Sequence, residues 1–141
     1  MLLHIVARGK IARSQEGELV ERYGKRITWP FLVTELPDTG GRVPPPKHEP
    51  ARRVLLDERG EDLSSQELAD RLAQWRDTGA REVQFLIGAA DGHSAEERER
   101  ADMLLSFGRA TWPHLLVRAM LAEQLYRAVS ILSGHPYHRA G

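Results

Sequence analysis

The chain alternates between short apolar runs and longer segments in which apolar residues recur every three or four positions. Short apolar runs of this kind are typical of strands. They cover Leu2–Ala7, Phe31–Leu36, Arg53–Asp57, Val83–Ile87 and Met103–Phe107. The run Val83–Ile87 is almost entirely apolar, which predicts a strand at the centre of a sheet covered on both faces.

The segments between these runs predict helices, because capping residues stand at their starts. Glu58–Asp62 is expected to be a turn, and Asp38–Pro50 a Pro-rich connector without periodicity. Alternating strands and helices predict one α/β domain over residues 1–141, with a mostly parallel sheet and helices on both faces. The caps are Ser14 before about Gln15–Ile27, Ser64 with Glu67 before Ser65–Asp77, and Ser94 with Glu97 before a short charged helix.

The last predicted helix, about His114–Ser133, is apolar around most of its circumference. Pro113 suits the first turn of a helix, and Gly134 suits the left-handed position just past its end. A helix with so wide an apolar surface is buried on several sides, since each large side chain left in water costs about 1.5–3 kcal/mol. We expect the sheet on one flank and another subunit on the other.

Polar residues interrupt this helix along a single line. Glu123, Arg127 and Ser130 are spaced i, i+4 and i+7, which places them on one side of the helix. An exposed Glu–Arg pair adds only about 0.3–0.5 kcal/mol and is common on solvated faces, so an ordinary ion pair and a functional site both stay open.

The tail after this helix concentrates reactive side chains. His135, Tyr137, His138 and Arg139 supply two imidazoles, a phenol and a guanidinium, groups that stack on bases, contact phosphate or move protons. A frayed terminus is the alternative interpretation.

Composition narrows the functional classes. The absence of cysteine excludes disulfides, thiol nucleophiles and Cys-ligated zinc, and His135 and His138 lack a third metal ligand, so we expect no metal. Met1–Ala7 is too short for a signal sequence or a membrane span, and we expect a soluble, cytoplasmic protein without a membrane partner.

Charge is balanced overall but unevenly distributed. Lys and Arg outnumber Asp and Glu by ten to six in residues 1–56 and by four to one in residues 108–141, whereas residues 57–107 carry six against thirteen. Nucleic-acid binding therefore cannot be inferred from net charge, although a local basic face remains open.

Ligands in parallel sheets collect at the carboxyl ends of strands. Here those ends are Leu56-Asp57, Gly88–Gly92 and Phe107–Trp112. The chain has no G-x-G-x-x-G, Walker or G-x-S-x-G motif, so three converging loops are better evidence for a site than any single motif.

Four motifs follow one another along the chain: Phe85–Gly92, Thr111–His114, Glu123–Ala128 and His135–Arg139. In order and spacing they resemble the ribosomal RNA large subunit methyltransferase H family, a group of small SPOUT-class enzymes. The resemblance implies an S-adenosylmethionine-dependent homodimer with a C-terminal trefoil knot that methylates N3 of a pseudouridine in 23S ribosomal RNA within the ribosome. Two departures are the short connector Asp38–Pro50, where a further helix is usual, and Arg109-Ala110.

The resemblance also implies where the cofactor binds, and the chemistry of methylation at N3 suggests roles for the polar side chains. We expect Glu123 and Arg127 to position the substrate, His138 to transfer a proton or contact the base, and Tyr137 to stack. A SPOUT enzyme acting on transfer RNA and a non-catalytic ribosome- or nucleotide-binding module are the alternatives. The implied cofactor residues are Leu56, Gly88, Phe107, Gly108, Arg109, Ala110, Thr111 and Trp112.

Overall fold

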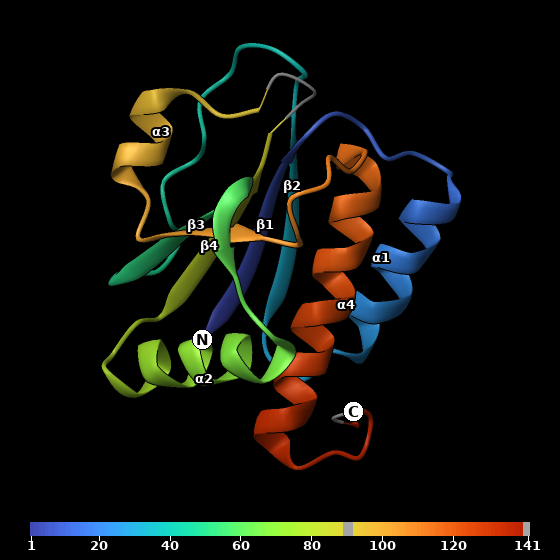
Figure 1. Ribbon diagram of the computed structural model, residues 1–141, viewed down its shortest axis with the longest axis vertical. Coiled ribbons are helices and arrows are strands. Elements are labelled where there is room, and N and C mark those ends of the chain that lie inside the picture. Colours follow the sequence, from blue (N-terminus) through green and yellow to red (C-terminus); the bar gives the residue numbers. More distant parts are fainter. Residues whose placement is uncertain (89–91, 140–141) are drawn as a thin grey trace.

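A computed structural model of the chain describes residues 1–88 and 92–139 and contains one parallel sheet (Figure 1). The strands stand in the order β2-β1-β4-β3-β5, and every neighbouring pair is parallel. The predicted α/β architecture is therefore confirmed. The strands are β1 (Leu2–Arg8), β2 (Phe31–Leu36), β3 (Ala51–Asp62), β4 (Glu82–Ile87) and β5 (Met103–Ser106).

The central strand is β4, as its apolar sequence predicts. It lies between β1 and β3, and all six of its residues are buried. Leu86 belongs to a small apolar cluster with Val6 and Leu55, whereas Phe85 belongs to the main core. Alternate residues of β4 therefore serve two separate clusters on the two faces of the sheet.

Helices cover both faces of the sheet, but unequally. On the main face, α4 packs against both α1 and α2, as Figure 1 shows. The other face is covered more thinly by the connector residue Val43 and by Ala101 at the end of α3. The helices are α1 (Gln15–Arg26), α2 (Ser65–Asp77), α3 (Ala95–Arg100) and α4 (His114–Ser133).

The predicted turn Glu58–Asp62 is wrong, because β3 continues through it to Asp62. Leu105 of β5 is the register partner of both Leu56 and Glu61, so β3 bends around β5 with an irregularity in between. A Cβ at Gly60 would lie 2.5 Å from the carbonyl carbon of Leu104. Pairing between distant segments overrides a local sequence that resembles a turn.

Other boundaries shift by one or two residues, and β3 begins at Ala51 instead of Arg53. Phe107 falls outside β5, and Ile27 is the C-cap of α1 instead of its last residue. The three capping serines all accept the expected backbone hydrogen bonds. No described helix is long and apolar enough to cross a membrane.

Candidate active site

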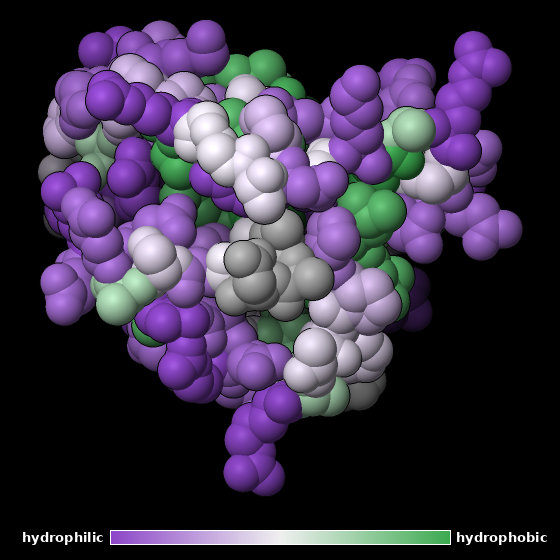
Figure 2. All heavy atoms as spheres, turned by 90° about the horizontal axis from the view of Figure 1, so that it is seen from above, coloured by the Kyte–Doolittle hydropathy of each residue, from purple (hydrophilic) through white to green (hydrophobic). Residues whose placement is uncertain are grey.

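A cavity of about 640 Å³ opens at the carboxyl edge of the sheet. Residues 56–59 of β3, the loops after β4 and β5 and the first turn of α4 surround it. Figure 2 views this end of the molecule and shows apolar atoms recessed between hydrophilic ones. Of the eight predicted cofactor residues, Arg109 does not line the cavity. The seven that do are Leu56, Gly88, Phe107, Gly108, Ala110, Thr111 and Trp112.

Gly88 lies where two stretches of backbone come close together. A Cβ at this position would lie 2.9 Å from the carbonyl oxygen of Gly92. Only glycine fits such an approach without moving the loop. The predicted loop residues Ala89, Ala90 and Asp91 lie outside the described residues.

The loop between β5 and α4 is held by its own hydrogen bonds. The Ser106 hydroxyl accepts from the Gly108 amide at 3.0 Å, and the Thr111 hydroxyl donates to the Glu58 carboxylate at 2.9 Å. The indole of Trp112 donates to the Phe107 carbonyl at 3.3 Å, yet the side chain stays 43% exposed. The loop thus forms one wall of the cavity and leaves an aromatic ring at the mouth.

Asp57 forms a charged network on the cavity wall. Its carboxylate accepts from the Arg98 guanidinium at 2.8 Å and from the Arg59 amide at 2.9 Å. Burial raises the pKa of Asp57, but these hydrogen bonds outweigh burial and lower the pKa to about 2. The sequence places Asp57 at a strand end, but it does not reveal that Arg98 joins it.

His93 is a second residue that sequence reasoning missed. It is buried against the cavity, and its Nε2 lies 3.0 Å from the carbonyl oxygen of Leu56. Burial lowers the pKa of His93, although Glu97 and the Leu56 carbonyl act against burial. A neutral imidazole with its proton on Nε2 satisfies this contact. The only sequence signal was its place directly after the glycine-flanked loop.

At the other end of α4, Arg127 joins the predicted catalytic residues. Its guanidinium donates to both carboxylate oxygens of Glu123, at 2.7 and 3.2 Å, and to Nδ1 of His138 at 3.1 Å. The hydrogen bond that Arg127 donates to Glu123 raises the pKa of Arg127, although burial acts against it. The structure therefore brings Glu123, Arg127 and His138 together, as their positions in the sequence predict.

Tyr137 completes this cluster, but its ring already has neighbours. The ring centroid lies 4.5 Å from that of Tyr126 and 4.8 Å from the Arg127 guanidinium carbon. Burial, with help from a hydrogen bond to Tyr23, raises the pKa of Tyr137. Ser130 stays apart, because its buried hydroxyl donates to the Tyr126 carbonyl.

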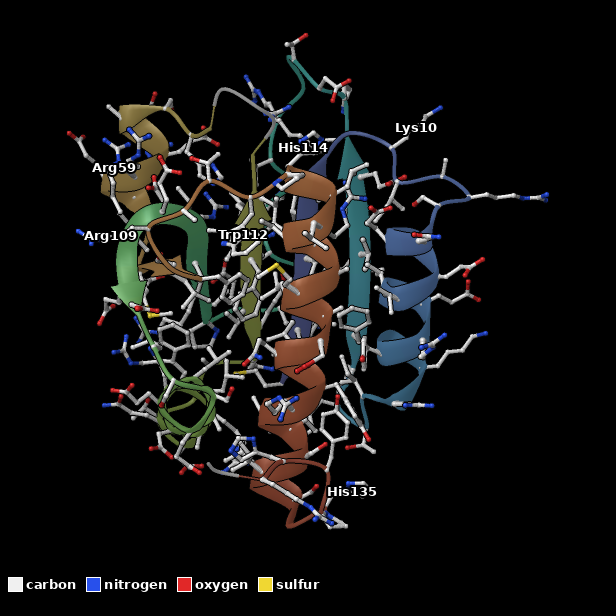
Figure 3. The ribbon with its side chains drawn as sticks, turned by 45° about the vertical axis from the view of Figure 1, so that its right-hand side comes forward. Lys10, Arg59, Arg109, Trp112, His114 and His135 are labelled. Carbon is white, nitrogen blue, oxygen red and sulfur yellow. The ribbon has the colours of Figure 1, made fainter. Side chains whose placement is uncertain are left out.

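The cavity and the tail cluster lie at opposite ends of α4. His114, which lines the cavity, precedes Glu123 by nine residues and Arg127 by thirteen. At 1.5 Å per residue these separations are about 14 and 20 Å. Figure 3 shows His114 at one end of the helix and His135 beyond the other end. Within one chain, Arg127 lies too far along α4 to reach this cavity, whereas Glu123 lines a second cavity of about 430 Å³ together with Leu105 and Phe107, which also line the first.

The described residues, 1–88 and 92–139, contain no group of three or more His, Asp or Glu side chains placed to hold a metal ion. The polar groups at the cavity are instead paired with one another. A ligand bound in the described part of the site would therefore contact hydrogen-bonding groups, backbone atoms and apolar side chains.

Comparison with known proteins gives consistent matches. A family model described as predicted SPOUT methyltransferase matches residues 1–138. A relative from Erythrobacter litoralis is 70% identical over 141 residues, and one from Novosphingobium aromaticivorans is 66% identical over 141 residues, each match covering 100% of both chains. A relative from Mesorhizobium japonicum is 43% identical over 160 residues, covering 99% of this chain and 100% of its own. All three are named Ribosomal RNA large subunit methyltransferase H.

Proposed function

Because this chain belongs to the ribosomal RNA large subunit methyltransferase H family of SPOUT methyltransferases, we propose that it methylates ribosomal RNA, at N3 of a pseudouridine in 23S ribosomal RNA. The observation that carries the proposal is the cavity, where seven of the eight residues implied by the resemblance converge. Since ribosomal RNA is the substrate, we place the activity in the cytoplasm.

The cavity suits S-adenosylmethionine. Its volume, about 640 Å³, falls in the range of small-molecule sites, and its walls combine apolar side chains with close backbone at Gly88. Leu56, Gly88 and the loop Phe107–Trp112 would hold the cofactor, which supplies an electrophilic methyl group when bound. Arg109 does not line the cavity, so we leave it out of the proposed cofactor contacts.

A homodimer resolves the separation along α4. One chain cannot bring Arg127 and His138 to its own cavity across about 20 Å of helix. A partner packed in the opposite direction on α4 would bring its tail to that cavity, and two-fold symmetry would complete both sites. Leu116 and Met120 are only partly buried on α4, and they provide apolar surface for such a contact.

The hydrogen bonds of the tail indicate which chemical role the His138 imidazole can take. N3 of pseudouridine carries a proton between two carbonyl groups and becomes a good nucleophile only as that proton leaves. A guanidinium can only donate, so Nδ1 of His138 accepts from Arg127 and the ring proton resides on Nε2. We therefore assign Nε2–H as a donor to a carbonyl of the base, and the N3 proton passes to solvent water as the N3–methyl bond forms.

Glu123 and Tyr137 act as positioning residues in this proposal. Both oxygens of Glu123 are bound by Arg127, which fixes the guanidinium beside His138. Tyr137 packs between Tyr126 and Arg127, so it anchors the tail instead of offering a free face to a base. This replaces the stacking role expected from the sequence.

The family also leads us to propose a C-terminal trefoil knot. Support comes from β3, two separate parts of which pair with Leu105 of β5. An experimental backbone trace whose ends could be drawn out without threading would contradict the knot.

Methyl incorporation tests the proposed function. Purified 23S ribosomal RNA, isolated large subunits, whole ribosomes and transfer RNA are each incubated with the protein and labelled S-adenosylmethionine, and the methylated nucleotide is mapped. We expect incorporation at a pseudouridine in at least one ribosomal substrate and none in transfer RNA. Incorporation into transfer RNA alone would identify the alternative enzyme. Cofactor binding without any incorporation would identify a binding module.

A further inference from the structure

Arg118 is a fully buried arginine in the otherwise largely apolar helix α4. Its guanidinium donates to the Glu35 carboxylate at 2.6 Å and to the carbonyl oxygens of Arg8 and Gly9 at 3.2 and 2.9 Å. Arg118 is fully buried whereas the Glu35 side chain is 38% exposed, and removing the Arg118 charge from water opposes the gain from pairing, so this ion pair is weak evidence for added stability. Arg118 is more informative for the neighbouring segment of the chain that it holds in place.

That segment is the loop 8–13 between β1 and α1, which we call the basic loop. Arg118 binds its first two carbonyl groups, and Glu35 accepts from the Ile11 amide at 2.8 Å. Ala12 has a φ of 50°, a left-handed conformation that costs an L-residue roughly 1–2 kcal/mol and persists only where the surroundings impose it. The loop is therefore held in one conformation.

The basic loop carries cations and no anions. Arg8 is engaged with the carbonyl groups of Pro37, Gly40 and Gly41. Lys10 and Arg13 are exposed, and neither makes an ion pair or a side-chain hydrogen bond with any residue in the described ranges. A loop fixed by buried groups thus presents two unpaired positive charges to solvent.

The position of the loop relates it to the cavity. The loop follows β1 at the same carboxyl edge, and a Cβ at Gly9 would lie 3.4 Å from Nε2 of His114, a residue of the cavity wall. Figure 3 shows Lys10 beyond the first turn of α4, pointing outward, with Arg59 and Arg109 on the opposite side.

We propose that the basic loop binds the phosphate backbone of the substrate RNA beside the cavity through Lys10 and Arg13, and that Arg118 is the positioning residue that holds the loop for this contact. The inference rests on the proposed function. RNA is favoured because Lys10 and Arg13 make no ion pair within the described residues and phosphates can pair with both, although Glu35 lies close enough to Lys10 to feel its charge. The substrate must also approach the mouth of this cavity.

The test removes both loop cations in the full-length protein. Lys10→Ala/Arg13→Ala is compared with Lys47→Ala/Arg81→Ala, which removes two exposed cations at the amino edge of the sheet. Binding to a naked RNA stem-loop is measured over a range of salt concentrations, together with methylation of the ribosomal substrate and S-adenosylmethionine binding. Wild-type methylation must be observed first, and its absence would count against the proposed function and not against the loop.

We expect the loop variant to bind RNA more weakly. The slope of log affinity against log salt concentration should be smaller in magnitude by about 1.4–1.8, because each of the two lost phosphate contacts reduces that slope by about 0.7–0.9. Cofactor affinity should not change, and the control variant should behave as wild type. A slope equal to that of the control would overturn the proposal. A loss seen with ribosomes but not with naked RNA would point to a ribosomal protein, and weaker cofactor binding would assign the loop to the cofactor; each result would also overturn it.

Arg118→Met with Glu35→Gln tests the positioning role while leaving both loop cations in place. The paired change avoids an unpaired buried charge, and the side-chain amide oxygen that Glu35→Gln introduces can still accept from the Ile11 backbone amide. We expect a higher KM for RNA, a nearly unchanged kcat and faster hydrogen exchange at Ile11. An unchanged KM despite faster exchange would show that loop order does not matter for RNA.

Discussion

The two ends of α4 are constructed differently. At its start, strand-end loops form a cavity from close backbone and from buried or paired groups, such as Asp57 with Arg98. At its end, a short tail is held by contacts that converge on a single side chain, Arg127. The first arrangement is nearly complete within one chain, whereas Arg127 at the second end lies about 20 Å along α4 from that cavity. Changes at the two ends should therefore have separable effects.

Removal of the tail should have the largest effect. A chain lacking residues 135–141 loses His138 and Tyr137, and we expect methyl transfer to be abolished while S-adenosylmethionine binding, measured by calorimetry, is largely retained. A chain shortened only by Ala140 and Gly141 is the control. Full activity in the longer deletion would show that the tail is not part of the site.

Gly88→Val should weaken cofactor binding, which removal of the tail leaves largely intact. The new side chain meets the backbone of Gly92, where even a Cβ would lie 2.9 Å from the carbonyl oxygen. We expect cofactor affinity to fall by roughly tenfold or more, a loss of at least about 1.4 kcal/mol, with a cooperative thermal transition that confirms folding. Undiminished affinity in calorimetry would remove Gly88 from the cofactor site.

Substitutions of His138 distinguish hydrogen-bond donation to the base from removal of its proton. If Nε2–H donates to the base, His138→Gln keeps an N–H donor and should retain much more activity than His138→Ala. If the imidazole instead removes the proton, both variants should lose a similar factor, about 10²–10⁴ for a general base. Single-turnover rates with saturating RNA distinguish these outcomes.

Asp57 should have the smallest effect, recognised by the way stability changes with pH in acid. Its pKa is lowered from 3.8 to about 2 on folding, so its contribution to stability is present above pH 4 and is lost as the pH falls toward 2. Over this window the free energy of unfolding should fall more steeply for wild type than for Asp57→Asn. Urea titrations at several pH values measure this, with Asp70→Asn as an exposed carboxylate control. If the free energy of unfolding changed with pH in the same way for wild type and Asp57→Asn, the lowered pKa of Asp57 would be contradicted.

The sequence predicts features that depend on local patterns. Strand and helix periodicity, the capping serines and the glycine after α4 identify nearly every element, and strand ends identify the cavity. The Glu123–Arg127 spacing likewise predicts a contact that the structure contains.

What the sequence misses depends on pairs far apart in the chain. Arg118 reaches Glu35 across 83 positions, and Arg98 reaches Asp57 across 41. The path of β3 past Gly60 similarly depends on β5, which no local pattern in residues 58–62 can indicate. Buried charges and strand pairing are decided by tertiary partners, and a single sequence does not name those partners.

Complementation between two inactive chains tests the central claim, that one chain's cavity works with the tail of another. Gly88→Val and the chain lacking residues 135–141 are co-expressed in equal amounts, and methyl transfer is measured on the mixed protein at an S-adenosylmethionine concentration at which neither variant is active alone. Random pairing makes about half of the dimers mixed, and each mixed dimer has one site with an intact cavity and an intact tail. The account predicts about a quarter of wild-type activity, whereas mixed dimers that form without any activity would contradict it.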